Sequence, residues 1–326
     1  MIEFEQNDCQ AVYYPLVSAG ILRLTGRDRL PFLQRQTTNN INQLSAETGQ
    51  VSVLTNAAAR ILDVFFIFIS PEGDESLFLL PLEGKADATA RYLKSRIFFM
   101  DQVTLTNESP AYCQFIVDGC QAADALKRAG FTTLPMTDGI QHAELDGLPV
   151  FLIGWRGLNQ PGPAFRLVAP AQSADNLQRV FQQSGMLSLD YDTREILRIE
   201  SGLPAAASEI SEEYTPLEIG LGYAVSDNKG CYTGQEIIAR QITYDKITRQ
   251  MVGLRLDQPV EQGSEVFAED RSVGKVTSAA LSPRLGPLAL AVLKRPYFTP
   301  QTQVVVKQGE QTIRAQVVEL PFSASD

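Results

Sequence analysis

Histidine is almost absent from this chain, and cysteine is rare. The 326 residues include one histidine, His142, and four cysteines, Cys9, Cys113, Cys120 and Cys231, with no Cys-x-x-Cys pair. These counts exclude a disulfide scaffold and make a zinc site or a permanent iron–sulfur cage within the chain improbable, so no metal site is predicted. Ser-His-Asp catalysis would depend on His142 alone, and its surroundings predict a strand, where a lone histidine is usually structural.

Positive charge and long apolar runs are also scarce. The chain has 28 lysines and arginines against 38 acidic residues, which gives a net charge of −10. A general basic field for nucleic-acid binding is therefore not expected. No stretch of 18 uninterrupted apolar residues occurs, and the first residues show no basic region followed by an apolar run. We expect a cytoplasmic protein with no membrane partner and no direct nucleic-acid partner.

Hydrophobic periodicity predicts an α+β fold of two mixed units, followed by a small barrel. Residues 64–69 are apolar on both faces, so their strand should lie inside a sheet. After Arg240 the chain changes to short strands separated by turn residues, which favours a small closed or half-closed β-barrel. We therefore expect a bipartite α+β region of two interleaved lobes at 1–245 and a barrel domain at 246–326. The predicted strands are 20–26, 50–55, 60–70, 76–81, 102–106, 113–118, 148–155, 164–168, 250–256, 274–278, 288–292, 304–306 and 313–318, and the predicted helices are 28–36, 85–98, 121–129, 173–183 and 192–200.

One stretch, residues 229–240, combines a cation, a thiol, two glycines and a carboxylate. Gly230 and Gly234 permit a tight backbone path or the close approach of a ligand, because they lack a Cβ atom. The residues after Gly234 predict the first turns of a helix. Cys231 precedes that helix and lies two residues from Lys229, a position that favours the thiolate form. The alternative is a half-buried cysteine in an ordinary turn, and the spacing alone does not decide between them.

Two further groups of charged residues are candidates for a site. Arg194 and Arg198 share one face of the predicted helix 192–200, and Glu200 lies at its end, where the helix dipole disfavours a carboxylate. That position hints at a ligand contact, and a surface charge cluster is the alternative. Asp63 interrupts an apolar strand, so either a strand edge exposes it or it serves a site.

The stretch from Lys229 to Glu236 resembles the Lys-Gly-Cys-Tyr-x-Gly-Gln-Glu signature of the YgfZ-type folate-binding proteins. These proteins act in iron–sulfur cluster assembly or repair and in tRNA modification, and they are related to the glycine cleavage T-protein, an aminomethyltransferase. Residues 198–202, Arg-Ile-Glu-Ser-Gly, are similar to the family's Arg-(Leu/Ile)-Glu-Ala-Gly element. Further similarities are Gly26, Asp28, Phe32, Leu33, Gln34, Gln36 and Thr38 in the N-terminal pattern, and Thr277, Ser278, Ser282, Pro283, Leu285, Gly286, Ala289, Leu290 and Ala291 in the barrel motif.

The resemblance implies a three-lobed, ring-like body with a central pocket for tetrahydrofolate or a one-carbon derivative. Glu200 matches the superfamily's pterin-contacting carboxylate, which accepts two parallel hydrogen bonds from an aminopyrimidinone edge. Cys231 belongs to the iron–sulfur branch, and Asp63 falls where aminomethyltransferases carry a catalytic aspartate. Further cofactor-binding candidates are Arg194, Arg198, Tyr232, Gly234 and Gln235.

Departures from both branches leave three hypotheses open. Ala59 and Arg60 replace the Gly-Gly of aminomethyltransferases, and Val64 replaces their second aspartate. The leading hypothesis is a folate-dependent accessory protein for iron–sulfur client or assembly proteins, which supports tRNA modification indirectly and uses Cys231 with Lys229. The second is an aminomethyltransferase of glycine cleavage that uses Asp63, and the third is a folate sensor without catalysis.

Overall fold

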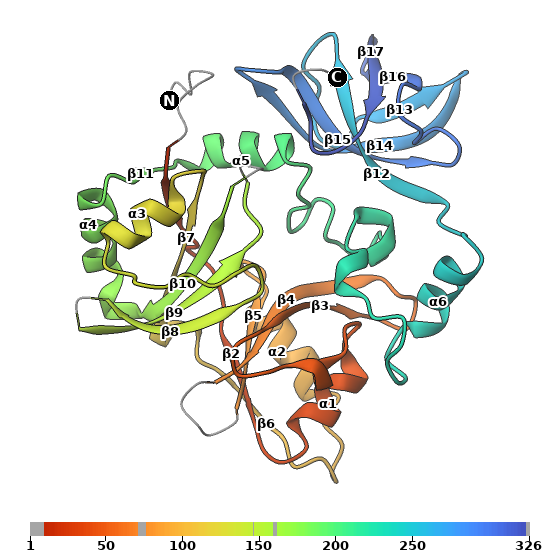
Figure 1. Cartoon of the computed structure of the whole chain (residues 1–326). Coiled ribbons are helices and arrows are strands. Elements are labelled where there is room, and N and C mark those ends of the chain that lie inside the picture. The colour runs from red at the N-terminus through yellow and green to blue at the C-terminus, as the bar shows by residue number, and fades with distance from the viewer. Residues whose placement is uncertain (1–9, 71–75, 146, 159–161, 324–326) are drawn as a thin grey trace. The chain divides into compact units, whose positions relative to one another are not determined.

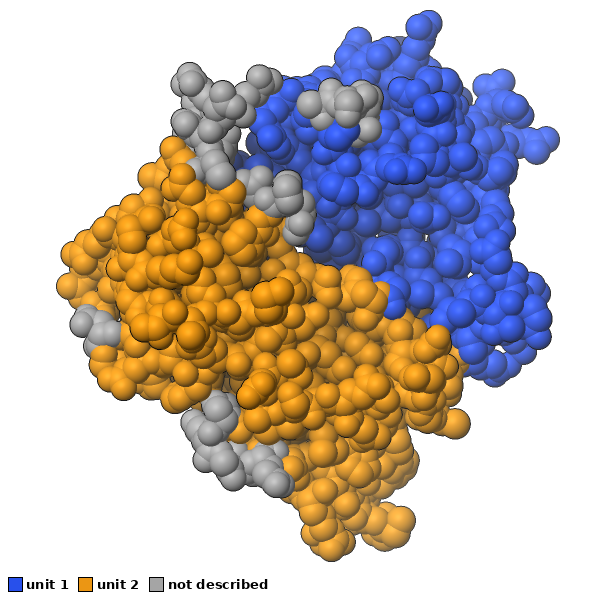
Figure 2. Space-filling view, viewed as in Figure 1, with its two compact units in different colours: residues 1–6, 190–222, 236–326 blue, residues 7–189, 223–235 orange. Residues whose placement is uncertain are grey.

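The structure is a computed structural model, and it describes all residues except 1–9, 71–75, 146, 159–161 and 324–326. Cys9 therefore lies outside the described residues. The chain forms two compact units, each built from separate stretches (Figure 2). Unit 2 consists of residues 7–189 and 223–235, and unit 1 of residues 1–6, 190–222 and 236–326.

Unit 2 contains a five-stranded antiparallel sheet with the order β3-β4-β5-β2-β6 (Figure 1). The predicted internal strand is confirmed, because β4 lies between β3 and β5 and is buried along both faces. A register shift between Leu54 and Thr55 marks the turn that joins β3 to β4. The strands are β2 (Leu22–Thr25), β3 (Gln50–Thr55), β4 (Ile61–Ile69), β5 (Leu77–Pro81) and β6 (Thr104–Asn107).

The second sheet of unit 2 has six strands in the order β11-β1-β7-β10-β9-β8. Its pairings are antiparallel except for the parallel pair of β1 and β11. His142 lies in β8, so the predicted strand position of this residue is confirmed. The strands are β1 (Val12–Pro15), β7 (Tyr112–Asp118), β8 (Ile140–Leu145), β9 (Leu148–Trp155), β10 (Ala164–Pro170) and β11 (Leu187–Ser188).

The two sheets of unit 2 pack face to face, and helices cover their outer faces. Phe66 and Phe68 of β4 meet Phe151 of β9 and Val168 of β10 in one buried apolar cluster. The alternate residues of β4, Phe65 and Ile67, face the helices instead. Helices α1 (Arg29–Gln36) and α2 (Ala86–Lys94) cover the five-stranded sheet, and α3 (Ala122–Arg128) and α4 (Ala174–Gln183) cover the six-stranded one.

Unit 1 contains α5 (Tyr191–Glu200), most of α6 (Gln235–Thr243) and a closed six-stranded barrel. The barrel order is β12-β15-β14-β13-β16-β17, and its interior is filled by small and branched apolar side chains, as in other small barrels. The α+β class with a C-terminal β-barrel is thereby confirmed. The barrel strands are β12 (Arg249–Leu256), β13 (Glu265–Ala268), β14 (Arg271–Ser282), β15 (Gly286–Lys294), β16 (Gln303–Gln308) and β17 (Gln311–Val318).

Several boundaries differ from the sequence-based expectation. Helix α2 ends at Lys94 rather than near Phe98, because the polar and apolar residues that follow turn away into a loop. Strands β1 and β13 were not expected, since each has four residues and too few positions for a clear alternation. The predicted division at residues 245 and 246 and the ring-like arrangement of lobes stay predictions.

Candidate functional site

Lys229 anchors the signature stretch to the end of helix α1. Its side chain is buried, and Nζ donates to the backbone oxygens of Thr37 at 2.5 Å and Asn39 at 2.6 Å. Thr37 is the C-cap residue of α1, where carbonyl groups that lack an intrahelical partner favour a cation. Burial lowers the pKa of Lys229 to about 7, while the two carbonyl acceptors favour its charged form. Lys229 is thus a structural anchor, and its part in catalysis stays a prediction.

Hydroxyl groups fix the rest of residues 223–235 to α1 and β3. The Thr38 hydroxyl donates to the Ala224 oxygen at 2.6 Å and accepts from the Val53 amide at 3.0 Å. The Thr55 hydroxyl donates to the Thr233 oxygen at 2.7 Å. These bonds join stretches far apart in sequence, so the segment is held at several points along its length.

Cys231 lies on this fixed segment with a free and exposed thiol. The alternative of a half-buried cysteine in an ordinary turn is therefore wrong for this residue. A Cβ atom on the preceding Gly230 would meet open space. Gly234 has φ +85°, and a Cβ there would lie 2.8 Å from the Asn56 oxygen, so this glycine permits close packing on the β3–β4 turn.

Two further signature residues flank the thiol on its C-terminal side. Tyr232 is buried, which raises its pKa to about 12, and its ring centroid lies 5.1 Å from Lys229 Nζ. Gln235 is half-buried and begins α6, as the sequence predicts. The structure thus brings Lys229, Cys231 and Tyr232 together on one short segment, while their roles toward a cofactor stay predictions.

Asp63 lies inside β4 and is completely buried. One carboxylate oxygen accepts from the Thr89 hydroxyl of α2 at 2.5 Å, and the other accepts from the amides of Val64 at 2.8 Å and Leu82 at 3.3 Å. Burial raises the pKa of Asp63 to about 6 against the effect of these hydrogen bonds. The idea of an exposed strand edge is wrong, because β4 is an interior strand and Asp63 faces the helical layer.

Glu200 is the last residue of α5 and is also buried. Its Oε1 accepts from the Ser282 hydroxyl at 2.5 Å, and its Oε2 forms an ion pair with Arg284. The Ser282 oxygen in turn accepts from the Leu285 amide at 2.9 Å. This arrangement overturns the surface-cluster alternative, since the carboxylate is largely buried against the end of β14.

Arg198 is buried too, although the helical pattern predicts a solvent position. Its guanidinium contacts Glu195 at 2.7 Å, Glu209 at 3.4 Å and the Ser278 hydroxyl at 3.1 Å. These contacts link α5 to the barrel strand β14 and to the loop after α5, which accounts for the buried charge. Arg194, one turn earlier, is half-buried, and its predicted cofactor contact stays a prediction.

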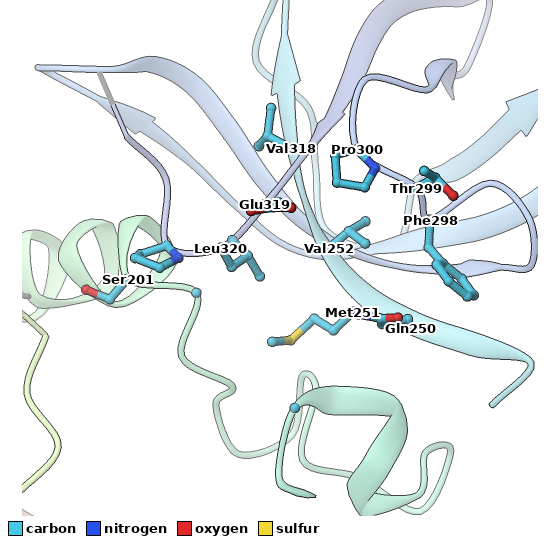
Figure 3. Close-up of a pocket in the computed structure, with 13 residues that line it drawn as sticks. Ser201, Gln250, Met251, Val252, Phe298, Thr299, Pro300, Val318, Glu319 and Leu320 are labelled. Carbon is cyan, nitrogen blue, oxygen red and sulfur yellow. The ribbon is translucent and has the colours of Figure 1, made fainter. Parts of the chain in front are cut away.

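A cavity of about 560 Å³ lies in unit 1 next to the end of α5 (Figure 3). Ser201 and Gly202 line one side, where a Cβ atom on Gly202 would lie 2.7 Å from Leu320 Cβ. The rest of the lining comes from Gly220, from the barrel strand β12, and from residues 298–300 and 318–321. None of the predicted site residues lines this cavity, whose apolar lining consists mainly of Met251, Val252, Phe298, Pro300, Val318 and Leu320.

The predicted site residues thus fall into two groups, one in each unit. Lys229, Cys231 and Tyr232 lie in unit 2, as does Asp63, and Glu200 lies in unit 1. Within the described part of the chain, no group of three or more histidine, cysteine, aspartate or glutamate side chains could hold a metal ion. None of the described helices combines the length and apolar character needed to cross a bilayer.

Sequence reasoning missed the partners of these residues. Ser282 lies in the Ser-Pro pair that resembles the family's barrel motif, so that motif carried a signal for the contact with Glu200. Thr38 belongs to the N-terminal pattern and carries a similar signal. No local pattern pointed to Arg284, Glu209 or Thr89.

Two family models cover the chain. The GCVT N-terminal domain matches residues 10–229, and the glycine cleavage T-protein C-terminal barrel domain matches residues 249–323. The chain therefore belongs to the glycine cleavage T-protein family. This membership agrees with mixed α/β units followed by a closed barrel.

Individual proteins that are similar to this chain include a putative transferase and aminomethyltransferases. "Putative transferase At1g60990, chloroplastic" of Arabidopsis thaliana is 31% identical over 288 residues, which are 85% of this chain and 66% of that protein. An aminomethyltransferase of Exiguobacterium sibiricum is 26% identical over 310 residues, 93% of this chain and 83% of that protein. The fold is similar to the crystal structure of the glycine cleavage system aminomethyltransferase T from Bartonella henselae, with TM-score 0.86, 22% identity, and coverage of 97% and 87% of the two chains.

Proposed function

We propose that this protein is a YgfZ-type folate-binding accessory factor for iron–sulfur client or assembly proteins. The observation that carries the proposal is the free, exposed Cys231 on a segment fixed by Lys229 and Thr38. A thiol held in one place and open to solvent can meet a reactive group on a partner or on a cofactor. In this proposal Cys231 is a nucleophile or a transient ligand, the protein is cytoplasmic, and support of tRNA modification is indirect.

Tetrahydrofolate or a one-carbon derivative is the cofactor in this proposal. Glu200 fits the aminopyrimidinone edge of a pterin, because a carboxylate has about four acceptor positions and Ser282 and Arg284 each use one. Each oxygen thus retains a lone pair for a donor from the ligand. The bound folate would supply one-carbon chemistry, while Glu200 would orient the ring.

The buried state of Asp63 supports an accessory role over aminomethyl transfer. A general acid or base must reach the proton that it transfers, within hydrogen-bond distance or through one water. The carboxylate of Asp63 is fully enclosed, and its donors are Thr89, Val64 and Leu82. A structural role linking β4 to α2 accounts for these contacts.

The test is complementation of cells that lack the protein, with iron–sulfur enzyme activity as the readout. Cys231→Ser should lose rescue while it still binds tetrahydrofolate in a titration of the purified protein. Cys113→Ser, which changes the other free cysteine among the described residues, is the matched control and should rescue fully. Full rescue by a normally folded Cys231→Ser variant would remove the thiol from the function.

Folate binding is tested separately with Glu200→Gln. Loss of a charged acceptor for paired hydrogen bonds should weaken tetrahydrofolate binding by roughly tenfold to a hundredfold. The Glu218→Gln variant is the control, since Glu218 is also buried in unit 1 and pairs with Arg249. Absence of binding by the unmodified protein would count against both the accessory-factor hypothesis and the aminomethyltransferase hypothesis.

Aminomethyl transfer is the second candidate, because several relatives are named aminomethyltransferase and the raised pKa of Asp63 is typical of functional sites. This candidate predicts release of ammonia and methylenetetrahydrofolate from an aminomethyl-loaded carrier protein, and loss of that turnover in Asp63→Asn. If Cys231 and Asp63 both prove dispensable while folate changes partner affinity, the sensor hypothesis gains support.

A further inference from the structure

The turn after helix α2 exposes three large apolar side chains in succession. Phe98, Phe99 and Met100 have relative exposures of 65%, 97% and 72%. They form what we call the apolar turn, in unit 2 beside the ends of α1 and α2, which lie at the lower end of Figure 1. Single exposed apolar residues are ordinary, whereas a contiguous group of them marks an interaction site.

The apolar turn has a defined conformation. Asp101 accepts from the Phe98 amide at 3.1 Å, and its own amide donates to the Phe98 oxygen at 2.9 Å. Arg35 of α1 binds both oxygens of Asp101, at 2.8 and 3.0 Å. The turn is therefore closed on itself and tied to α1, so little conformational entropy would be lost when it binds.

A second loop lies beside the apolar turn. The Gln102 amide donates to the Asp28 carboxylate at 2.8 Å, and the Asp28 amide donates to the Gln102 oxygen at 3.3 Å. A Cβ atom on Gly26 would lie 2.1 Å from that Gln102 oxygen, so the two loops are in close contact. Arg27 follows Gly26, and its side chain is 71% exposed, although its Nε lies 3.7 Å from an Asp28 carboxylate oxygen.

Cations gather around this apolar turn, although the chain is acidic overall. Arg27 lies on the neighbouring loop, and Lys94 and Arg96 precede the turn at the end of α2, all of them exposed. The Arg96 guanidinium lies 4.9 Å from the ring centroid of Tyr92, which restricts its position. An apolar centre with a rim of cations is thus present on a chain of net charge −10.

We propose that the apolar turn is a docking surface for a partner protein that presents an apolar pocket with carboxylates around its rim. Phenylalanine, methionine and arginine are enriched in protein interfaces, and aromatic anchors in their centre carry most of the binding energy. A protein pocket fits better than an anionic bilayer, because the net charge of −10 opposes approach to an extended negative surface. This inference does not depend on the proposed folate function.

The test places the photo-crosslinking residue p-benzoylphenylalanine in the full-length protein, expressed in the organism from which the sequence comes. Position 99 is the probe, and position 17 is the control, because Val17 is 89% exposed in the same unit but lies elsewhere. The position-99 experiment is repeated with Arg27→Glu and Arg96→Glu combined. Purified protein is also sedimented with vesicles of phosphatidylcholine and phosphatidylglycerol at 3:1, and its mass is followed by light scattering.

The proposal expects one discrete crosslinked protein at position 99, none at position 17, and at least tenfold less adduct after the two charge reversals. The crosslinked peptide of the partner should contain acidic residues. The proposal would be overturned if no adduct formed at position 99, or if the amount of adduct were unchanged by the two charge reversals. Vesicle binding that is lost in Phe98→Ser/Phe99→Ser, or self-association that is lost in the same variant, would overturn it in favour of a lipid or a second copy.

Discussion

Two buried carboxylates, Asp63 and Glu200, differ in what surrounds their charge. Glu200 has the guanidinium of Arg284 beside it, so its negative charge is compensated. The hydrogen-bond donors to Asp63 are a hydroxyl and two amides, all of them neutral. Burial disfavours the charged form of Asp63 and raises its pKa, and this effect outweighs the opposing effects of the three hydrogen bonds and of the Lys85 charge.

The raised pKa of Asp63 predicts a pH-dependent stability. The folded protein keeps the proton up to about pH 6, whereas the unfolded chain loses it near 3.8, so the stabilising contribution is complete below 3.8 and disappears as pH rises to 6. A shift of about 2 pKa units corresponds to about 3 kcal/mol. The free energy of unfolding of the unmodified protein, minus that of Asp63→Asn, should therefore fall by about this amount between pH 4 and 6.5.

Urea unfolding of both proteins at a series of pH values measures this difference. Asparagine suits the site, since its oxygen accepts from Val64 and Leu82 and its amide donates to the Thr89 hydroxyl. Thr89→Val serves as a control, because it removes one partner but keeps the titrating carboxyl group. A difference that does not change with pH would mean that Asp63 ionises normally in the fold.

Segments, rather than single residues, decide how Cys231 is presented. Thr38 and Thr37 are neighbours, and both are completely buried, but their hydroxyl groups bind different elements. The Thr38 hydroxyl bonds to the Ala224 oxygen and the Val53 amide, whereas that of Thr37 bonds to the Leu33 oxygen within α1. This pair allows the attachment of residues 223–235 to be tested without a general loss of packing.

Thr38→Val should loosen residues 223–235, since it leaves a buried carbonyl and amide without their partner at a cost of roughly 1–3 kcal/mol. Amide hydrogen exchange in this segment should become faster by about tenfold or more, and the reactivity of Cys231 toward a thiol reagent should change. Thr37→Val should leave exchange in the segment unchanged. Equal effects from the two variants would contradict the selective attachment through Thr38.

Helix α5 is joined to the barrel strand β14 by a second buried network. Arg198 lies between Glu195 and Glu209, and Glu209 also accepts from the Ser278 hydroxyl at 2.8 Å. Arg198→Met should destabilise unit 1 by about 3–5 kcal/mol, because it leaves the charge of Glu209 buried without its cation. Addition of Glu209→Gln should restore part of this loss, as measured by thermal unfolding. A double variant that is less stable than Arg198→Met would argue against this electrostatic cause.

Periodicity in the sequence was sufficient to predict most helices and strands, but it was insufficient to predict the contacts between them. The doubly apolar run of β4 and the short barrel strands separated by turn residues are local signals, and both predicted correctly. Glu200 and Ser282 are 82 positions apart, and Lys229 and Thr37 are 192 positions apart. Such pairings depend on the folded path of the chain, which explains why Glu200 and Arg198 looked like surface charges.

At the scale of the whole molecule, the barrel depends on residues that precede it. Arg249 pairs with Glu218 at 3.0 Å, Ser278 binds Glu209, and Ser282 binds Glu200. Residues 246–326 alone would lack all three acidic partners and would expose the β14 surface that α5 covers. We expect this fragment to unfold at a lower temperature than the barrel in the intact chain, or to aggregate.

Circular dichroism of the fragment and differential scanning calorimetry of the full-length protein provide the comparison. A longer fragment, residues 190–326, retains Glu200, Glu209 and Glu218 and is the matched control. It should be more stable than residues 246–326. If the two fragments unfolded at the same temperature, the stability of the barrel would be independent of α5 and of the loop that follows it.

The discontinuous construction of unit 2 has a consequence for its synthesis on the ribosome. Residues 7–189 leave the ribosome before residues 223–235, and residues 190–222, which belong to unit 1, lie between them. Before residues 223–235 emerge, the carbonyl oxygens of Thr37 and Asn39 cannot accept hydrogen bonds from Lys229. Domains fold largely as they emerge, so the attachment of the segment is a late event in the folding of unit 2. The thiol of Cys231 therefore reaches its fixed place after most of that unit has formed. A nascent chain that ends before residue 231 does not contain this thiol.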